Sequence, residues 1–183
     1  MKILAVSGSI RRDSHNTNLL RAAAEAAPAG VEVELWDGIG DLPIYDQDLD
    51  GAEPESVLRL RKAWSEADAI LFATPEYNGS IPGGLKNAID WASRPKFHAA
   101  LTNKTVAVVG ASTGQFGAMW GQADLRKVLG IAGARVVSDE LPVARAHEKF
   151  DADGRLLDAE LHERLRLVLS TLAAEAAVEQ VAA

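Results

Sequence analysis

Two loops of this sequence hold residues whose types and spacing suit a ligand with a phosphate and a flat ring. The first loop, residues 8–17 (GSIRRDSHNT), combines hydroxyl, amide and guanidinium donors directly before a predicted helix. The second loop, residues 75–84 (PEYNGSIPGG), consists mostly of turn-forming residues between an apolar run and another predicted helix. Donors of the first kind can bind a phosphate, and the main chain of a tight turn can hydrogen-bond the polar edge of a ring.

The first loop is a candidate phosphate site because the N-terminus of a helix has unsatisfied N–H groups and a partial positive charge. Its side-chain donors are Ser9, Arg11, Ser14, Asn16 and Thr17. The glycine fingerprint of dinucleotide-binding folds and the Gly-Lys-Ser/Thr triplet of a P-loop are both absent, so side chains are expected to hold the phosphate. In the alternative interpretation, Ser14 or Asn16 only caps the helix and the arginines lie on a solvated face.

The net charge of −7 argues against a general nucleic-acid surface, so an anion site has to be formed locally. The start of the chain supplies a local excess of cations, opposed by Asp13 alone: Lys2, Arg11, Arg12 and Arg21. We expect Arg12 to be solvated. We expect His15 to lie at the surface, because no second metal ligand is near it in the sequence, and we predict no metal site.

The second loop is predicted to form a wall against an isoalloxazine ring, which makes flavin mononucleotide (FMN) the ligand that both loops favour together. The residues assigned to this wall are Pro75, Glu76, Tyr77, Asn78 and Gly79. The Asn-Gly pair supplies a tight turn, and the proline at position 82 suits the first turn of the following helix. In the alternative interpretation, the segment is a plain strand–turn–helix connection with Tyr77 as a half-buried packing residue.

A third glycine-rich loop, residues 110–117 (GASTGQFG), follows a further apolar run. Ser112 and Gly114 are candidates to contact the ring or the ribityl chain from the other side. The same loop also matches the Gly-x-Ser-x-Gly elbow of serine hydrolases, with Ser112 as the nucleophile. Its partners in chain order would be Asp139 or Asp151, and His147 or His162. The hydrolase is the weaker interpretation, because it gives the first two loops no role.

Hydrophobic periodicity predicts a regular alternation of strands and helices. Strands are expected at 2–7, 31–36, 69–74, 104–110 and about 134–144, and helices at 16–27, 55–67, 83–93, 117–130 and 158–179. Five such units predict a doubly wound α/β fold, a single domain over residues 1–183, whose parallel sheet has the order 2-1-3-4-5 and helices on both faces. In that order the first two loops follow neighbouring strands, at the switch point where such sheets bind ligands.

Bulk properties limit the class of protein. The 183 residues suffice for one domain with a full core, and no apolar stretch of about 18 residues predicts a membrane span. The chain enters a strand at once without a signal-peptide pattern and has no cysteine, which excludes disulfides and thiolate metal sites and favours the cytoplasm. Residues 38–54 form a long acidic connection that is expected to be functional or mobile. Four tryptophans are expected in the core or at an interface: Trp36, Trp64, Trp91 and Trp120.

These motifs resemble the NADPH-dependent FMN reductase family, which includes bacterial quinone and chromate reductases and some azoreductases. The resemblance runs in order over about residues 1–150, and residues 75–91 (PEYNGSIPGGLKNAIDW) are its most specific element. It implies a flavodoxin-like fold, tightly but non-covalently bound FMN, and homodimers or homotetramers with the site near a subunit interface. The matching residues are Ser9, Arg11, Ser14, Asn16 and Thr17 for the phosphate, Pro75, Glu76, Tyr77, Asn78 and Gly79 for the isoalloxazine, and Ser112 and Gly114 beside it.

The third loop departs from the family's Gly-Gly ending, because Gly117 is followed by Ala118. We expect the methyl group of this alanine to narrow access for the nucleotide.

The resemblance also implies a reaction in which NADPH or NADH gives a hydride to the flavin, and an acceptor takes two electrons from the same face. The acceptor is expected to be a small molecule: a quinone, an azo compound, chromate or a flavin. No side chain is expected to act as an obligatory acid or base. The alternative from another class is a flavodoxin-type electron carrier. Arg11 argues against it, because flavodoxins typically surround the phosphate with neutral donors.

Overall fold

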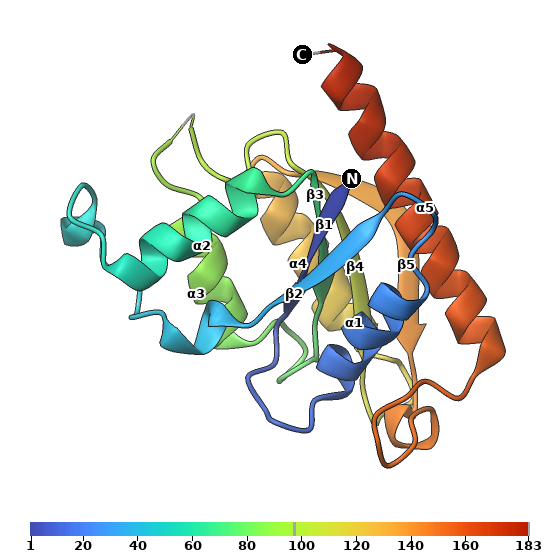
Figure 1. The fold of residues 1–183 in the computed structure, drawn as a ribbon. Helices are drawn as coiled ribbons and strands as arrows, with labels where there is room; N and C mark the ends of the chain where they lie inside the picture. Colours follow the sequence, from blue (N-terminus) through green and yellow to red (C-terminus); the bar gives the residue numbers. More distant parts are fainter. Residues whose placement is uncertain (97, 183) are drawn as a thin grey trace.

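The computed structural model describes residues 1–96 and 98–182 and contains one five-stranded parallel sheet. Its strands are β1 (Lys2–Ser7), β2 (Glu32–Trp36), β3 (Ala69–Ala73), β4 (Thr105–Ala111) and β5 (Arg135–Val143). They lie in the order β2-β1-β3-β4-β5, so the predicted fold class and strand order are confirmed (Figure 1). The centre of the sheet, formed by β1, β3 and β4, is almost entirely buried, as the continuous apolar runs predict.

Helices cover both faces of this sheet (Figure 1). On one face lie α1 (His15–Glu25) and α5 (Ala159–Ala182). On the other lie α2 (Glu55–Glu66), α3 (Gly83–Ala92) and α4 (Met119–Ile131). Short 3-10 turns occur at η1 (Gly38–Asp41), η2 (Gln47–Leu49) and η3 (Ala146–Glu148). The predicted elements therefore match the observed ones to within a few residues, and none of the helices in the described part of the chain could cross a membrane.

Successive side chains along each strand point to opposite faces of the sheet, so the protein has two hydrophobic cores, one on each face. Ile3 points to the core under α1 and α5, whereas the next residue, Leu4, points to the core under α2, α3 and α4. Trp64 and Trp91 are fully buried in this second core, as predicted for the tryptophans, while Trp36 packs at its edge and Trp120 is half exposed. The large aromatic side chains therefore stabilise the face of the sheet that carries three helices.

The long acidic connection over residues 38–54 is attached to α3 by hydrogen bonds and a ring contact. Asn87 accepts a hydrogen bond from the backbone N–H of Tyr45 at 2.7 Å and donates one to the Pro43 carbonyl at 2.8 Å. The indole N–H of Trp91 donates to the same carbonyl at 2.8 Å, and the rings of Tyr45 and Trp91 meet edge to face. These contacts fix the connection beside the helix that follows the second loop.

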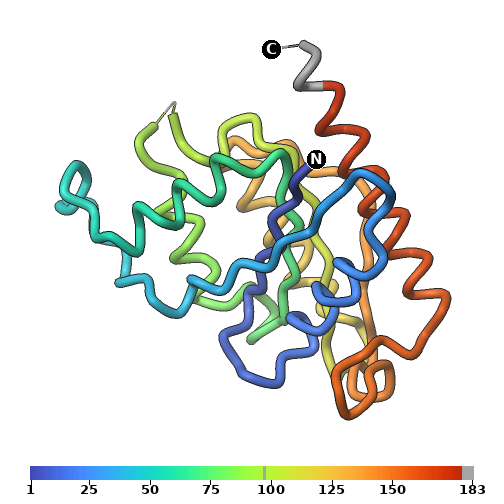
Figure 2. The backbone as a smooth tube through the Cα atoms, viewed as in Figure 1, coloured from blue at the N-terminus to red at the C-terminus, as the bar shows by residue number. Residues whose placement is uncertain are grey.

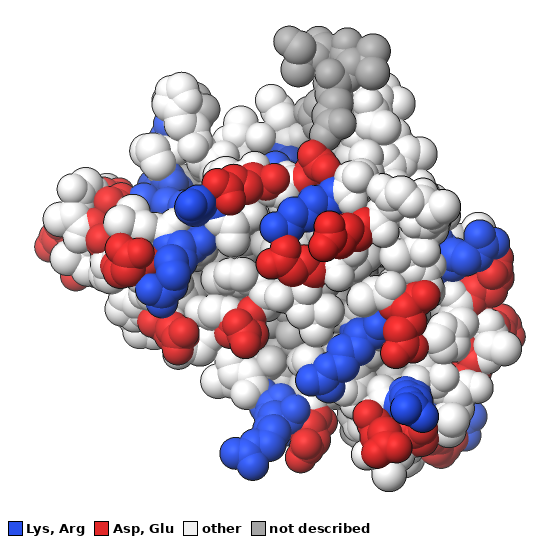
Figure 3. Space-filling view, viewed as in Figure 1, with Lys and Arg blue, Asp and Glu red and all other residues white. Residues whose placement is uncertain are grey.

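Charged side chains of both signs are interspersed on the visible face of the molecule (Figure 3). Lys and Arg side chains also project at its lower edge, where Figure 1 has the loop between β1 and α1. The loops that follow β1, β3 and β4 all leave the sheet at this lower edge (Figure 2). The carboxyl ends of three neighbouring strands therefore bring the three predicted loops to one place.

Candidate functional site

One pocket of about 160 Å³ at the carboxyl edge of the sheet is lined by all three predicted loops. The first loop contributes Ser9, Arg11, Ser14, His15 and Asn16, the second Pro75, Glu76 and Tyr77, and the third Ala111, Ser112 and Thr113. The backbone N–H of Gly8 donates to the Ala73 carbonyl at 2.8 Å, which joins the first loop to the end of β3, just before the second loop. Eight of the twelve predicted residues line this pocket; Thr17, Asn78, Gly79 and Gly114 lie close in sequence but do not line it.

The first loop places buried hydroxyl groups beside the N-terminus of α1. Ser14 is the N-cap of that helix, and its side chain accepts the N–H of Thr17 at 3.4 Å. Ser9 and Ser14 are both buried, yet both line the pocket. Arg11 is exposed at the pocket and forms no ion pair with any residue that the structure describes. Hydroxyls, a helix N-terminus and an unpaired guanidinium together form a donor set that fits a phosphate monoester.

His15 is partly buried and lines the edge of the pocket, so the expected surface position is only partly exposed. Its ring stacks on Phe150 with the ring centroids 5.7 Å apart, and its Nδ1 is buried without a hydrogen-bond partner. Burial, and then the positive charge of Arg11, lower the pKa of this histidine below its ordinary value, so it is neutral near pH 7. The stacking contact with Phe150 places His15 as a packing residue at the edge of the pocket.

Asn16 holds the first loop against the third. Its side-chain nitrogen donates to the Ala111 carbonyl and its side-chain oxygen accepts the Ala111 N–H, both at 2.9 Å. The side chain is buried, so this pair is shielded from water. The sequence analysis assigned Asn16 to the phosphate and did not predict this pairing. Its partner, Ala111, lies 95 residues away, and no sequence pattern indicates the contact. In this arrangement Asn16 joins the two loops, and its acceptor oxygen and one of its two amide hydrogens are engaged.

The second loop contains a two-residue turn closed by two backbone hydrogen bonds. The N–H of Tyr77 donates to the Ser80 carbonyl at 3.0 Å, and the N–H of Ser80 donates back at 3.2 Å. Asn78 and Gly79 have φ values of 55° and 75°, which define a type I′ turn. The tight turn predicted from the Asn-Gly pair is confirmed. Tyr77 is 52% exposed and lines the pocket, so about half of its surface is open to a ligand.

The side chain of Glu76 caps a helix from outside that helix. Its carboxylate accepts the backbone N–H groups of Trp120 and Gly121, each at 3.0 Å, in the first turn of α4. The N-cap position of α4 is Ala118, which has no side-chain oxygen to serve this purpose. The carboxylate therefore supplies the missing cap and is favourably placed at the positive end of the helix. Sequence reasoning missed this role, although an alanine at the N-cap is a signal that the cap comes from elsewhere.

Comparison with known proteins decides between the classes left open by the geometry. The family model described as "NADPH-dependent FMN reductase" matches residues 1–148. This chain belongs to that family. It is 41% identical over 174 residues to an NAD(P)H-dependent FMN reductase of Pseudomonas aeruginosa, covering 94% of this chain and 93% of the relative. It is 37% identical to the 2-hydroxy-1,4-benzoquinone reductase of a Burkholderia species, with 95% of each chain covered.

A solved structure agrees with this family membership. The chain superposes on FerB, a flavoenzyme NAD(P)H:(acceptor) oxidoreductase of Paracoccus denitrificans, with a TM-score of 0.82 and 38% identity. The match covers 93% of this chain and 94% of FerB. The predicted flavodoxin-like fold and the predicted use of FMN with NAD(P)H are thereby confirmed for this chain. The donor set of the first loop suits the phosphate of FMN.

The Gly-Ala ending of the third loop has a left-handed backbone conformation at both residues, Gly117 and Ala118. Gly117 has a φ of 58°, and a Cβ there would lie 2.7 Å from the backbone carbon of Pro142, so only glycine fits. Ala118 also lies in the left-handed region, with a φ of 61°, and is only 2% exposed. The expectation that its methyl group narrows nucleotide access is therefore wrong: the methyl is buried, and its effect is on the backbone.

The serine hydrolase alternative finds no support in this site. The Ser112 hydroxyl accepts the N–H of Gly114 at 3.1 Å, a contact within its own turn. Of the two candidate histidines, His147 lies near Glu148 at 3.6 Å, and His162 contacts the Leu156 carbonyl at 3.1 Å. No hydrogen bond joins Ser112 to a histidine within the described residues.

Proposed function

We propose that this chain is an NAD(P)H-dependent, FMN-containing reductase that passes two electrons to a quinone. The observation that carries the proposal is the pocket where the loops after β1, β3 and β4 meet, because it joins phosphate donors to a turn-rich wall at the switch point of the sheet. The family membership supports the same activity and argues against a flavodoxin-type electron carrier.

The positions of the site residues support the following proposed roles. Ser9, Arg11 and Ser14, with the N-terminus of α1, bind the phosphate. Asn16 and Thr17 orient these donors, the first through Ala111 and the second through a 2.9 Å hydrogen bond to the Ser7 hydroxyl. The remaining assigned residues lie around the ring: Pro75, Glu76, Tyr77, Asn78, Gly79, Ser112 and Gly114.

The flavin supplies the hydride-accepting chemistry when it is bound. The protein therefore has to bind and orient the flavin and to exclude water from it. The second loop suits this task because its turn is fixed by backbone hydrogen bonds and its Glu76 side chain is engaged with α4. Main-chain N–H groups at the wall can therefore stabilise negative charge on a ring without a titrating side chain. We assign no acid or base residue to the reaction.

A quinone is the proposed acceptor among the small molecules that remain possible. The relatives named as reducing quinones include the Burkholderia enzyme and an NAD(P)H:quinone oxidoreductase of Solanum tuberosum, which is 41% identical over 182 residues. The exposed aromatic side chain of Tyr77 at the pocket also suits a flat, uncharged ring better than a small inorganic anion such as chromate.

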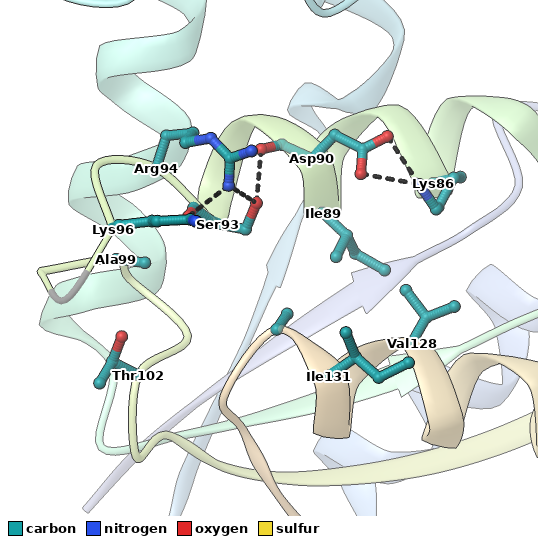
Figure 4. Close-up of a pocket in the computed structure, with 11 residues that line it drawn as sticks. Lys86, Ile89, Asp90, Ser93, Arg94, Lys96, Ala99, Thr102, Val128 and Ile131 are labelled. Carbon is teal, nitrogen blue, oxygen red and sulfur yellow. Dashed lines mark hydrogen bonds and ion pairs between the residues drawn. The ribbon is translucent and has the colours of Figure 1, made fainter.

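We further propose that the chain assembles into a homodimer or homotetramer. A groove of about 470 Å³ lies between α3 and α4, with Ile89, Val128 and Ile131 pointing into it and the Lys86–Asp90 ion pair at one end (Figure 4). Exposed apolar side chains also lie at the two ends of α4, where Met119 and Trp120 are half exposed and Ile131 is 78% exposed. Such a face favours contact with a second copy. A cytoplasmic location is likewise proposed, from the absence of cysteine.

The visible absorbance spectrum of the purified protein tests the proposed function directly. We expect a flavin spectrum that bleaches when NADPH is added without oxygen and returns when a benzoquinone is added. A flavin that stays oxidised after NADPH addition would support the electron carrier instead. A colourless protein that gains no flavin spectrum on incubation with FMN would overturn the proposal. Light scattering after size-exclusion chromatography measures the proposed assembly separately.

A further inference from the structure

Helix α4 contacts both of the loops that are assigned to the isoalloxazine. The carboxylate of Asp124 accepts a hydrogen bond from the hydroxyl of Ser80, the residue that ends the turn of the second loop. Two residues earlier in the helix, the side-chain amide of Gln122 donates to the Gly117 carbonyl of the third loop at 2.9 Å. The roles proposed above use neither Asp124 nor Gln122, so the contacts of this helix remain to be explained.

The second loop is held to α4 on both sides of its turn. Before the turn, the Glu76 carboxylate accepts the N–H of Gly121 at 3.0 Å. The two backbones are also close there, because a Cβ on Gly121 would lie 3.1 Å from the Pro75 carbonyl oxygen and 3.3 Å from the Cα of Glu76. After the turn, the hydrogen bond from Ser80 to Asp124 makes the second attachment. The turn between these two points is therefore fixed relative to the helix.

Helix α4 is itself anchored to the sheet and can hold the loop in place. The guanidinium of Arg126 donates to two carbonyls of β5, to that of Asp139 at 3.2 Å and to that of Val137 at 2.5 Å. Leu125 and Leu129 are fully buried in the core beneath the helix. The hydrogen bond from the second loop therefore ends on a rigid element rather than on another loop.

The tip of the turn carries hydrogen-bond donors that the protein leaves available. Asn78 and Gly79 are exposed, and their backbone N–H groups make no hydrogen bond to the part of the chain that the structure describes. The direction of these N–H groups depends on the turn, which the backbone bonds between Tyr77 and Ser80 close. Because the Ser80 hydroxyl is bonded to Asp124, a change at Asp124 reaches the two free N–H groups through a single residue.

We propose that Asp124 is a positioning residue for the flavin, because through Ser80 it fixes the turn whose free N–H groups bind the polar edge of the isoalloxazine. The inference rests on the proposed function, since it requires this turn to line the ring. Donors that are already held in place stabilise negative charge better than donors that must reorganise. Reduction adds electrons to the ring, so loss of the contact between Ser80 and Asp124 weakens the binding of reduced FMN more than that of oxidised FMN.

A double-mutant cycle on Ser80 and Asp124 tests this inference without relying on turnover. The two readouts are the Kd of FMN and the two-electron midpoint potential of the bound FMN. For Asp124→Ala we expect the Kd of oxidised FMN to rise about threefold and that of reduced FMN about thirtyfold. This difference of about tenfold corresponds to a midpoint potential about 30 mV more negative. Ser80→Ala should have the same effect and the double variant no larger one, because both residues act through one hydrogen bond.

Two further variants separate positioning from a general effect on the fold. Asp124→Asn keeps a side-chain oxygen as an acceptor for the Ser80 hydroxyl, so it should recover most of the wild-type potential. Lys127→Ala removes an exposed side chain of the same helix and is the matched control, which should change neither readout. If Asp124→Ala does not fold, Ser80→Ala and Asp124→Asn provide the same comparison.

The outcomes separate this inference from the proposed function. A wild-type potential in Ser80→Ala, or additive effects in the double variant, would overturn the inference, because the two residues would then not act as a pair. Equal losses of affinity for oxidised and reduced FMN in Asp124→Ala would also overturn it, because a general loosening of the fold gives that pattern. A wild-type protein that binds no FMN would contradict the proposed function itself.

Discussion

The side-chain amide of Asn16 pairs with both backbone hydrogen-bonding groups of Ala111, joining two loops that are 95 residues apart in sequence. Both residues are buried, so replacing Asn16 by alanine leaves one N–H and one carbonyl unpaired away from water. We expect this substitution to lower the free energy of unfolding by about 2–4 kcal/mol. Urea unfolding measures it, with Asn18→Ala as the control because the Asn18 side chain accepts an exposed hydrogen bond from Arg21. Equal effects of the two substitutions would contradict the positioning role.

Arg11 is expected to contribute to FMN affinity rather than to the stability of the fold. It is exposed, lines the candidate site and forms no ion pair within the described part of the chain. We expect Arg11→Ala to weaken FMN binding by about 10- to 100-fold, which corresponds to one lost charge-assisted phosphate contact. The flavin-to-protein ratio after dialysis measures this effect, and Arg21→Ala, on the exposed side of α1, is the control. Full flavin occupancy in Arg11→Ala would show that the phosphate lies elsewhere.

The parts of the fold and site that follow local rules could be predicted from the sequence. Apolar runs such as residues 69–73 predicted the buried parallel strands, and the Asn78-Gly79 pair predicted the turn that the structure shows. The strand order followed from the alternation of strands and helices, and it placed the first two loops side by side. These features depend on neighbours in the chain or on general rules of topology.

The parts that could not be predicted depend on partners distant in sequence or on backbone conformation. Nothing near Asn16 indicates that its amide faces the end of β4, and nothing near Glu76 indicates that it caps α4. Helix α4 also begins two residues later than predicted, because Gly117 and Ala118 both adopt left-handed conformations. Periodicity continues through such residues, so the pattern alone extends the helix too far.

Ala118 is expected to destabilise the native state, because alanine at a φ of 61° is strained and glycine is not. We therefore expect Ala118→Gly to raise the free energy of unfolding by about 1 kcal/mol. The opposite sign is expected for Ala123→Gly, an exposed position inside α4, which should lose about 1 kcal/mol. Thermal unfolding of the two variants beside the wild type tests the contrast. A loss of stability in both would show that the methyl group of Ala118 contributes more through packing than it costs in strain.

The ion pair between Glu53 and Arg61 is expected to make stability depend on pH below about pH 4.5. The two side chains meet at 2.5 Å and are each only 14% exposed, and the hydrogen bond from Arg61 lowers the pKa of Glu53 from its ordinary value of 4.5 to about 2. A depressed pKa in the folded state stabilises the protein above pH 4.5, and that contribution is lost as the pH falls towards 2. We expect Glu53→Gln to be less stable than the wild type near neutral pH and the difference to shrink in acid.

Urea midpoints measured at neutral and acidic pH test this expectation, with Glu55→Gln, an exposed acidic position at the start of α2, as the control. The control should show no such pH dependence. A difference between Glu53→Gln and the wild type that stays constant across this range would mean that the carboxylate does not titrate as its pairing predicts.

Glu76 is expected to stabilise α4 through its carboxylate and to leave FMN binding to its main chain. Glu76→Ala removes the acceptor for the N–H groups of Trp120 and Gly121, so we expect a loss of about 1 kcal/mol in the free energy of unfolding. Glu76→Gln keeps one side-chain oxygen as an acceptor but loses the charge at the helix N-terminus, so its loss should be smaller. Because the side chain of residue 76 contacts α4, we expect the Glu76→Gln variant to retain the wild-type flavin content. Thermal unfolding and the flavin-to-protein ratio of both variants test whether the side chain caps α4 and the main chain binds the flavin. A Glu76→Gln protein that is stable but free of flavin would show that the carboxylate binds the cofactor instead.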